Sequence, residues 1–284
     1  MMNIFRKLKM RTMFSSSEVA VADYIIEHPE QVMNMSVKEL SQAAHASLST
    51  IYRLCDKLEV NGFSALKVEV SRSLEDFSRV DDEFDFNFPI KSHSTYAQML
   101  ARLKHDYEQT ILSTYNLFDL EELRLVAQHM RRASKIDVFT SAGNVFLADN
   151  FRFQMQEIGV DVNVPREDYE LKLTAARTDK THLAIVISFG GRWGGLKRIM
   201  EILKEQNCPV VLITSTEFDF RSFPADYHLY ISSYENHYKK ISSYSTRLSV
   251  LFILDMLYTG FFNLDYDRNL QTKLDYYKKL SGHV

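Results

Sequence analysis

Five short apolar segments recur through the second half of the chain, and each is separated from the next by a stretch long enough for a helix. They are residues 136–140, 160–164, 183–189, 210–214 and 227–231. Parallel strands must be joined by crossovers of this length, usually helices, which then cover both faces of the sheet. The alternation therefore predicts an α/β domain with a parallel five-stranded sheet flanked by helices.

The start of the chain shows a different pattern, with short helical segments and strong signals at their ends. A helix is expected to begin at the serines 15–17 and to end at His28, because the proline that follows disfavours helix in the residue before it. Ser36 and Glu39 match a capping box, in which each side chain satisfies a free backbone donor of the other residue. Ser47 is placed to cap a third helix, whose apolar residues follow the i, i+3, i+4, i+7 spacing. These apolar residues are Ile51, Leu54, Cys55 and Leu58.

Two capped helices joined by so short a turn are typical of a helix-turn-helix motif. The outward side of the second helix carries side chains that can donate hydrogen bonds to phosphates and base edges. They belong to a mixed polar set, namely Ser49, Thr50, Tyr52, Arg53, Asp56 and Lys57. An ordinary helical hairpin presents the same faces as plain surface, so the spacing alone leaves both interpretations open.

Residues 77–91 lose this pattern and become acidic and aromatic, with Pro89 near their end, so we interpret them as a linker. Helices are expected at 94–117 and 120–132. A last helix is expected at about 239–262, and its apolar run is too continuous for a surface helix, which predicts packing under the sheet or between subunits. We therefore divide the chain into an all-α helix-turn-helix domain at 1–76, a linker and connecting helix at 77–117, and the α/β domain at 118–284.

The net charge of −3 and the pI of about 6.3 give no global sign of nucleic acid binding, so any DNA contact must come from a local patch. One candidate is the start of the chain, which carries Arg6, Lys7, Lys9 and Arg11. Cys55 and Cys208 lie far apart in apolar surroundings, which favours a reducing compartment over a disulfide framework. The start lacks an apolar region of signal-peptide length, and the strongest apolar stretch, 248–262, contains Asp255. We expect a cytoplasmic protein without a membrane span.

Two of the expected junctions between a strand and the next helix are rich in small and hydroxylated residues. They are residues 140–144, with the sequence Thr-Ser-Ala-Gly-Asn, and 188–192, with the sequence Ser-Phe-Gly-Gly-Arg. In a parallel sheet such junctions lie at the carboxyl ends of the strands, where backbone donors at a helix start can hold an anion. A phosphate site is one interpretation, and the other is that the glycines only permit tight turns.

Five motifs in the helical part form a dense pattern, FSSSE, ADYI, MSVKEL, TIYRLC and NGF, at residues 14–18, 22–25, 35–40, 50–55 and 61–63. This pattern resembles the N-terminal helix-turn-helix domain of the RpiR family of transcription regulators. Farther along, the two glycine-rich loops and the segments 225–229, 245–248 and 254–257 resemble the SIS domain that follows it in that family. The expected fold is thus an all-α helix-turn-helix domain followed by an α/β SIS domain.

The resemblance implies that the helix at about 47–59 enters the major groove of an operator. The candidate DNA contacts are then Ser47, Ser49, Thr50, Tyr52, Arg53 and Lys57. We expect Arg53 to contribute most. His45 and Glu59 stand where the family often has glycine, so the turn and the helix end should form less comfortably here.

In SIS domains that bind sugar phosphates, hydroxyl side chains and backbone amides of both loops hold the phosphate. The resemblance implies the effector-binding candidates Ser141, Gly143, Asn144, Ser188, Gly190, Gly191 and Arg192. Asn144, Gly190 and Trp193 stand where serine, serine and threonine are usual. Three possibilities stay open: a different ligand, binding through backbone amides with Asn144 and Arg192, or loss of the ligand.

The function that the resemblance implies is a DNA-binding transcription regulator of sugar or amino-sugar metabolism whose SIS domain senses a phosphorylated sugar. Two alternatives stay open, an SIS-type sugar-phosphate isomerase with a helical extension and a regulator whose SIS domain only dimerises. The expected partners are double-stranded operator DNA, a small phosphorylated sugar, and further copies of the chain in a homodimer or homotetramer.

No enzyme activity, metal or cofactor is expected. The histidines are scattered, and the two cysteines cannot form a Cys-x-x-Cys site. Glu235 and His237 could serve as acid and base near a sugar, but polar surface residues far outnumber catalytic ones.

Overall fold

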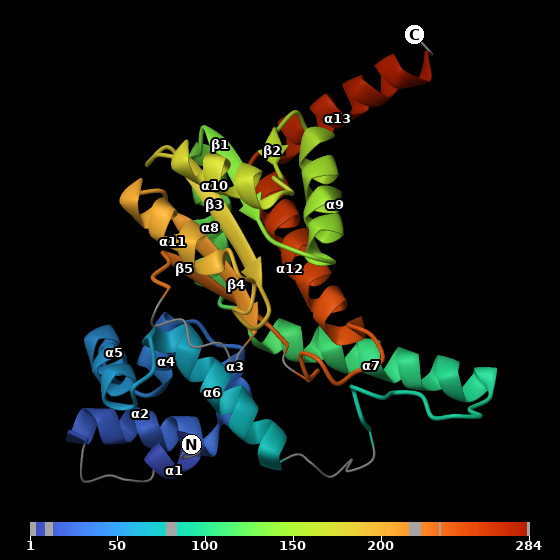
Figure 1. Cartoon of the computed structure of the whole chain (residues 1–284). Helices are drawn as coiled ribbons and strands as arrows, with labels where there is room; N and C mark the ends of the chain where they lie inside the picture. Colours follow the sequence, from blue (N-terminus) through green and yellow to red (C-terminus); the bar gives the residue numbers. More distant parts are fainter. Residues whose placement is uncertain (1–3, 9–13, 78–83, 216–222, 233, 283–284) are drawn as a thin grey trace.

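The chain forms a bundle of short helices and, above it in the view of Figure 1, a sheet flanked by helices. The computed structural model describes residues 4–8, 14–77, 84–215, 223–232 and 234–282. Lys9 and Arg11 of the expected basic run lie outside these residues.

The helical part contains the caps that the sequence predicts. Its described helices are α1 (Ile4–Leu8), α2 (Ser16–Glu27), α3 (Pro29–Met33), α4 (Val37–Ala43), α5 (Leu48–Lys57) and α6 (Gly62–Phe77). Ser15 and Ser36 each form a capping box with the glutamate three residues later, and the Ser47 side chain accepts the Thr50 N–H. The helices enclose a shared apolar core that includes Ile25, Leu40, Ile51, Leu54 and Leu66.

His45 and Glu59 adopt the left-handed backbone conformation, with φ of 49° and 61°. Each follows the end of a helix, and the N–H of the next residue bonds to the carbonyl five residues earlier at 3.0 Å. This is the Schellman arrangement, in which glycine is the usual left-handed residue. A side chain with a Cβ is strained there, so α4 and α5 each end at some conformational cost.

The α/β part carries five parallel strands in the order β2-β1-β3-β4-β5, and the expected fold class is confirmed. The strands are β1 (Lys135–Phe139), β2 (Val162–Asn163), β3 (His182–Ser188), β4 (Val210–Ser215) and β5 (Tyr227–Ile231). The second strand is shorter than the expected 160–164. Gly159 just before that segment has a φ of 76°, and Pro165 just after it has no N–H for the ladder, so only the middle residues pair.

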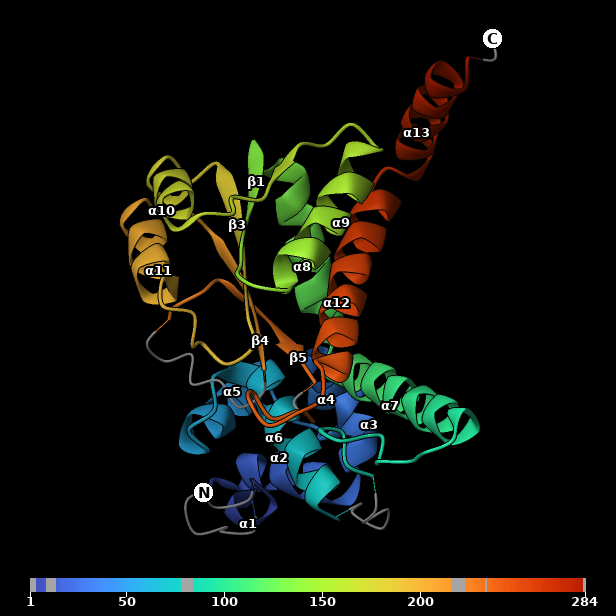
Figure 2. The same ribbon diagram turned by 45° about the vertical axis from the view of Figure 1, so that its right-hand side comes forward.

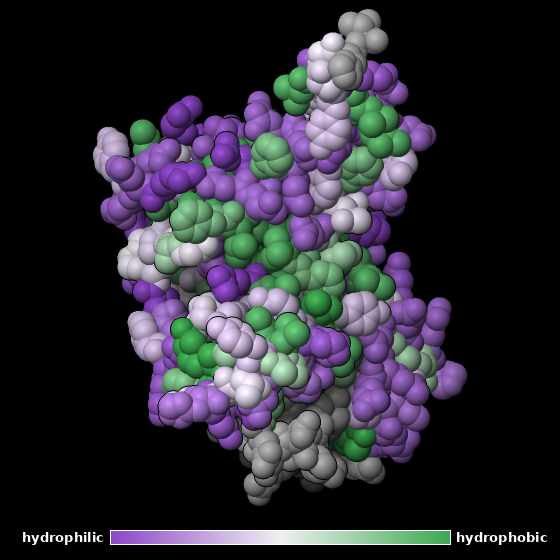
Figure 3. Space-filling model, turned by 90° about the vertical axis from the view of Figure 1, so that its right-hand side faces the viewer, coloured by the Kyte–Doolittle hydropathy of each residue, from purple (hydrophilic) through white to green (hydrophobic). Residues whose placement is uncertain are grey.

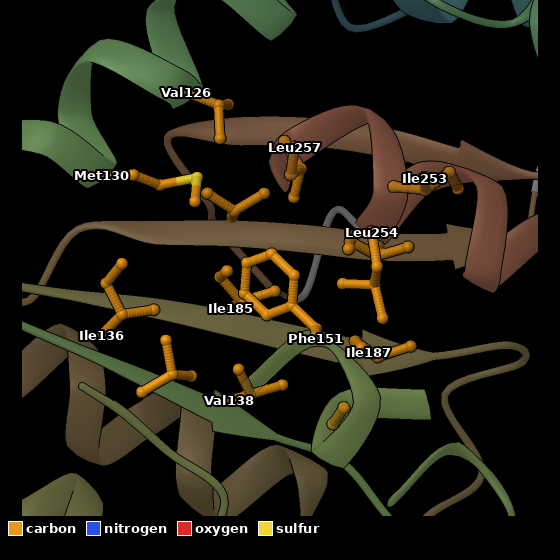
Figure 4. Close-up of a cluster of buried hydrophobic side chains, with 14 of the residues drawn as sticks. Val126, Met130, Ile136, Val138, Phe151, Ile185, Ile187, Ile253, Leu254 and Leu257 are labelled. Carbon is orange, nitrogen blue, oxygen red and sulfur yellow. The ribbon is translucent and has the colours of Figure 1, made fainter. Parts of the chain in front are cut away.

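Helices cover both faces of the sheet. The helices from residue 96 onward are α7 (Tyr96–Asn116), α8 (Leu120–Arg132), α9 (Asn144–Gln156), α10 (Asp168–Ala176), α11 (Leu196–Glu205), α12 (Tyr244–Asn263) and α13 (Tyr266–Ser281), of which α13 projects away from the sheet (Figure 1). In Figure 2, α8, α9 and α12 lie on one face and α10 and α11 on the other. Figure 4 shows the core of the first face, where Phe151 and Leu254 from the helices meet Ile185 of the sheet.

The last helix expected at 239–262 differs in the structure. α12 begins only at Tyr244, because the Asn236 side chain accepts the N–H groups of Tyr238 and Lys239 and holds a turn there. The polar helix α13 was not expected. The apolar run of α12 is buried on the side that packs under the sheet and half-buried on its other side. No single described helix is long and apolar enough to cross a membrane; α12 and α13 reach that length only as a pair bent by 104°.

Candidate DNA-reading helix and effector loops

The outward face of α5 presents three of the predicted DNA contacts. Ser49, Tyr52 and Arg53 are exposed. Thr50 is buried, and its hydroxyl accepts a hydrogen bond of 3.3 Å from the Arg53 guanidinium. The hydroxyl of Ser47, which caps the helix, lies 2.8 Å from those of both Ser49 and Thr50. Ser47 and Thr50 therefore form a hydroxyl chain that holds Arg53 in place.

Lys57, another predicted contact, is occupied within the helical part. Its ammonium lies 2.6 Å from the Glu18 carboxylate, which is only 2% exposed and also accepts the Ser15 N–H at 2.7 Å. Burial alone would raise the pKa of Glu18, but the hydrogen bonds from Lys57 and Ser15 outweigh it and lower the pKa. Lys57 thus anchors the end of α5 to the start of α2, and the sequence analysis did not identify Glu18 as its partner.

The helical part is joined to the α/β part through α6. The Lys67 ammonium, 1% exposed, donates to the carbonyl oxygens of Met33, Met35 and Phe118 at 3.2, 3.4 and 2.8 Å. Beside it, Val68 packs with Leu117 and Tyr230 in a small buried cluster. The junction therefore combines the hydrogen bonds of Lys67 with the apolar packing around Val68, and neither was expected from the sequence.

Glu122 at the start of α8 completes the junction. Its carboxylate accepts the Ser64 hydroxyl of α6 at 3.0 Å and the His228 N–H of β5 at 2.6 Å. Burial raises the pKa of Glu122 to about 7, although both hydrogen bonds lower it. The Tyr52 pKa is raised by burial and by the carboxylates of Asp119 and Glu122, so the reading face of α5 lies close to this junction.

The two predicted effector loops lie side by side, because β1 and β3 are neighbours in the sheet. β1 leads outward to β2 and β3 leads to β4 on the other side, so the loops occupy the topological switch point where ligands bind in such sheets. The buried Thr140 hydroxyl ties them together by donating to the Ile187 carbonyl at 2.9 Å. In the first loop Ser141 and Asn144 are half-buried, and Ala142 rather than Gly143 takes the left-handed conformation, with φ of 53°.

The second loop turns at Gly190 and Gly191, of which Gly191 has a φ of 68°. Ser188 is buried, Arg192 is exposed, and Trp193 packs at the edge of the core under α11. Of the three hydroxyl side chains in these loops, those of Thr140 and Ser188 are buried and only that of Ser141 is partly open to solvent.

A segment after β5 lies over this second loop, and we call residues 234–243 the cover loop. The His237 ring is stacked on Phe189 with the ring centroids 6.2 Å apart, and a Cβ added to Gly190 would lie 3.8 Å from the His237 Nδ1. The Lys240 ammonium lies 5.4 Å from the centre of the Phe189 ring, and the Arg192 guanidinium lies over the Tyr238 ring. The cover loop therefore adds two basic side chains to the predicted site.

These basic groups affect one another. Burial lowers the pKa of His237, and the positive charges of Arg192 and Lys240 lower it further. Lys240 is paired at 2.8 Å with Glu235, which is 4% exposed and also accepts the Ser245 N–H. Glu235 thus holds the start of α12 and the base of the cover loop, a structural position in which both carboxylate oxygens are already bonded. Basic groups beside backbone amides favour an anion.

Among the described residues, no group of three or more histidine, cysteine, aspartate or glutamate side chains could hold a metal ion. Both cysteines are buried, and burial raises the pKa of Cys55 to about 12 and that of Cys208 to about 11. Neither thiol is set up as a nucleophile.

Comparisons with known proteins agree with this two-part arrangement. A model described as the helix-turn-helix domain of the rpiR family matches residues 2–76, and one of the SIS domain matches residues 129–260. HTH-type transcriptional regulators from Caldanaerobacter subterraneus and Haemophilus influenzae are 27% and 26% identical to this chain. These alignments cover 88% and 95% of this chain, and 86% and 94% of the relatives. The structure of the Vibrio vulnificus NanR protein complexed with ManNAc-6P has a TM-score of 0.58 at 16% identity and covers 99% of both chains.

The fold, the paired matches and the names of the relatives define the class as a transcription regulator built from a helix-turn-helix domain and an SIS domain. Within that class, the chain belongs to the RpiR family.

Proposed function

We propose that this regulator controls genes of sugar or amino-sugar metabolism and senses a phosphorylated sugar. The effector is held between Ser141, Gly143 and Asn144 of the first loop and Ser188, Gly190, Gly191 and Arg192 of the second. The observation that carries the proposal is the convergence of Arg192, His237 and Lys240 at the Gly190 turn. The positive charges of Arg192 and Lys240 act on the His237 ring, and the negative charge of a phosphate would offset them there.

For operator binding, we propose that Arg53, Ser49 and Tyr52 face the major groove, while Ser47 and Thr50 support Arg53 from behind. The division into a DNA-reading part at 1–76, a linker and connecting helix at 77–117, and a sensing part at 118–284 follows from this assignment. We place the protein in the cytoplasm, where its operator would be.

We also propose that the protein acts as a homodimer or homotetramer. Figure 3 shows apolar side chains gathered across the face that α9 and α12 share, below the projecting α13. On α9 the side chains of Phe146 and Phe153 are 72% and 59% exposed, and their spacing of seven residues places them on the same side of the helix, two turns apart. Apolar surface of this kind commonly marks a protein contact.

A thermal-shift panel tests the effector proposal. We expect ManNAc-6P or another hexose or hexosamine phosphate to raise the melting temperature by about 5 °C at a hundredfold excess over its Kd. Arg192→Ala should abolish the shift, and Arg198→Ala, which removes an exposed arginine of α11, should not. If no sugar phosphate stabilises the wild type, the SIS domain serves only for dimerisation. If a sugar phosphate is converted, the protein is an isomerase.

A further inference from the structure

The cover loop is bound on its other side by the linker that leads to the DNA-reading domain. We call residues 84–89 the strap. The Phe86 ring is stacked on Tyr234 with the centroids 4.3 Å apart and the planes 15° from parallel. The side-chain oxygen of Asn87 accepts the Asn236 N–H at 2.5 Å, and its backbone carbonyl accepts the Ile241 N–H at 2.9 Å. One strap residue thus binds the cover loop at both ends.

The strap is itself held in a defined shape. The Asp85 carboxylate accepts the N–H groups of Asn87 and Phe88 at 2.8 and 3.3 Å, which fixes the turn that presents Asn87. The Phe84 ring contacts the Phe86 ring and also packs on His105 of α7, with the centroids 4.8 and 4.7 Å apart. The strap therefore lies between α7 and the cover loop, with contacts to each.

The cover loop consequently has contacts on two sides. On one side, His237 and Lys240 lie against the loop of Gly190, where the proposed phosphate would bind. On the other, Tyr234, Asn236 and Ile241 bind the strap. Only residues 78–83 separate the strap from the end of α6, which carries the junction with the DNA-reading helices.

From this arrangement we infer that docking of the strap on the cover loop is the step that couples effector binding to operator binding. An effector that draws His237 and Lys240 toward a phosphate repositions the same loop that Asn87 holds. A ligand shifts a conformational equilibrium only by its differential affinity for the two states, and the strap supplies two such states, docked and undocked. The inference rests on the proposed sensing of a phosphorylated sugar and names how that sensing reaches the DNA.

The first test compares Phe86→Ala/Asn87→Ala with the control Phe88→Ala in the full chain. The control removes a strap phenylalanine that is 39% exposed and has no ring contact with the cover loop among the described residues. Operator affinity is measured on a duplex selected in vitro with the wild type, with and without saturating ManNAc-6P. In the wild type and control the ligand should change operator affinity by about fivefold or more. In the double variant the change should fall below about twofold, with the separate affinities for ManNAc-6P and DNA retained. A double variant that responds like the wild type overturns the inference.

The second test needs no variant and no effector, so it separates this inference from the proposed function. Hydrogen exchange of the Asn236 and Ile241 amides is followed in the wild type with and without the selected duplex. If DNA binding changes strap docking, the exchange rates of these two amides should change by about tenfold or more, while that of the Ser245 amide, held by Glu235, should stay the same. If the duplex leaves the exchange rates of the Asn236 and Ile241 amides unchanged, as it should that of Ser245, strap coupling is refuted. Failure of every sugar phosphate in the thermal-shift panel would instead refute the proposed effector.

Discussion

The Lys67 Nζ donates a hydrogen bond of 2.8 Å to the backbone carbonyl oxygen of Phe118, joining α6 of the helical part to the residue two positions before α8. The same ammonium donates to the carbonyls of Met33, the last residue of α3, and of Met35 just beyond it, so a single buried charge holds three chain segments together. Burial lowers the pKa of Lys67, while the nearby carboxylates of Asp119, Glu122 and Glu39 oppose this.

Replacing Lys67 by methionine should destabilise the protein strongly. The methionine keeps most of the volume but leaves three carbonyl oxygens without their donor, at a cost of about 2–4 kcal/mol. Lys38→Met, at an exposed position of α4, should change stability by less than about 0.5 kcal/mol. The free energies of unfolding are measured by urea titration, and equal values for the two variants would show that the Lys67 bonds contribute nothing.

Stability should fall with rising pH in a way that depends on Glu122. A carboxyl whose pKa is raised on folding, here from 4.5 to about 7, binds its proton more tightly in the folded state. The contribution of Glu122 to the free energy of unfolding is therefore fully present below pH 4.5 and lost as pH rises through 7, a change of about 3 kcal/mol. Glu122→Gln, which does not ionise, should lack this loss. Urea midpoints at pH 5 and pH 8 test it: the drop in the wild type minus the drop in the variant must be positive.

The His237 imidazole should report on anion binding. Its pKa is lowered by burial and by the charges of Arg192 and Lys240. Bound phosphate adds negative charge beside it, so ManNAc-6P should raise the pKa, and Arg192→Ala should raise it without ligand. The titration is followed by NMR of the imidazole protons, with His45 in the helical part as the reference signal. A His237 titration that is indifferent to ManNAc-6P, in a protein that binds the compound, would place the phosphate elsewhere.

Arg53→Ala should weaken operator binding by about 1–3 kcal/mol, and the binding should fall steeply with salt. Thr50→Val removes the hydroxyl to which Arg53 donates, so it should also weaken operator binding, but by less than Arg53→Ala. Lys57→Ala should instead lower the free energy of unfolding, measured by urea titration, because it leaves the buried Glu18 without its ion-pair partner. Fluorescence anisotropy on the selected duplex measures the operator affinities of the Arg53 and Thr50 variants. If Thr50→Val has no effect while Arg53→Ala does, the hydroxyl chain does not position the arginine.

His45→Gly should stabilise the helical part by about 0.5–1 kcal/mol, because glycine takes a φ of 49° without strain. Gln42→Gly, in the adjacent helix, should destabilise by about 1 kcal/mol and serves as the control. Melting curves of the two variants should move in opposite directions. A lower melting temperature for His45→Gly would mean that the His45 side chain stabilises the protein by more than its left-handed backbone conformation costs.

The sequence analysis succeeded where the structure is decided locally. Ser15, Ser36 and Ser47 cap helices because a serine and the donors it satisfies lie within three residues, and the loops after β1 and β3 follow from short strand-end patterns. The left-handed conformations at His45 and Glu59 agree with the strain expected there. These features need no knowledge of distant contacts.

Features made by residues far apart in sequence were missed. Lys240 approaches Phe189 from about fifty residues away, and Asn87 bonds to Asn236 across 149 positions. The pattern of residues 77–91 identified a linker by its composition, but composition does not reveal which backbone donors a linker binds. The burial of Glu18 and Glu122 and their hydrogen-bond partners were not predicted either, because only the fold determines which groups lie next to a carboxylate.

β5 lies at the end of the sheet, and the unpaired side of such a strand is a template on which other chains can add strands. Here the Glu122 carboxylate of α8 accepts a hydrogen bond from the His228 N–H of β5, and Val68 of α6 packs with Tyr230. α8 of the same domain and α6 of the helical part therefore both cover β5, and we expect this cover to oppose pairing with strands of other chains. An α/β domain cut free in the linker would lose the cover that Val68 gives Tyr230, and we expect it to aggregate more readily than the full chain.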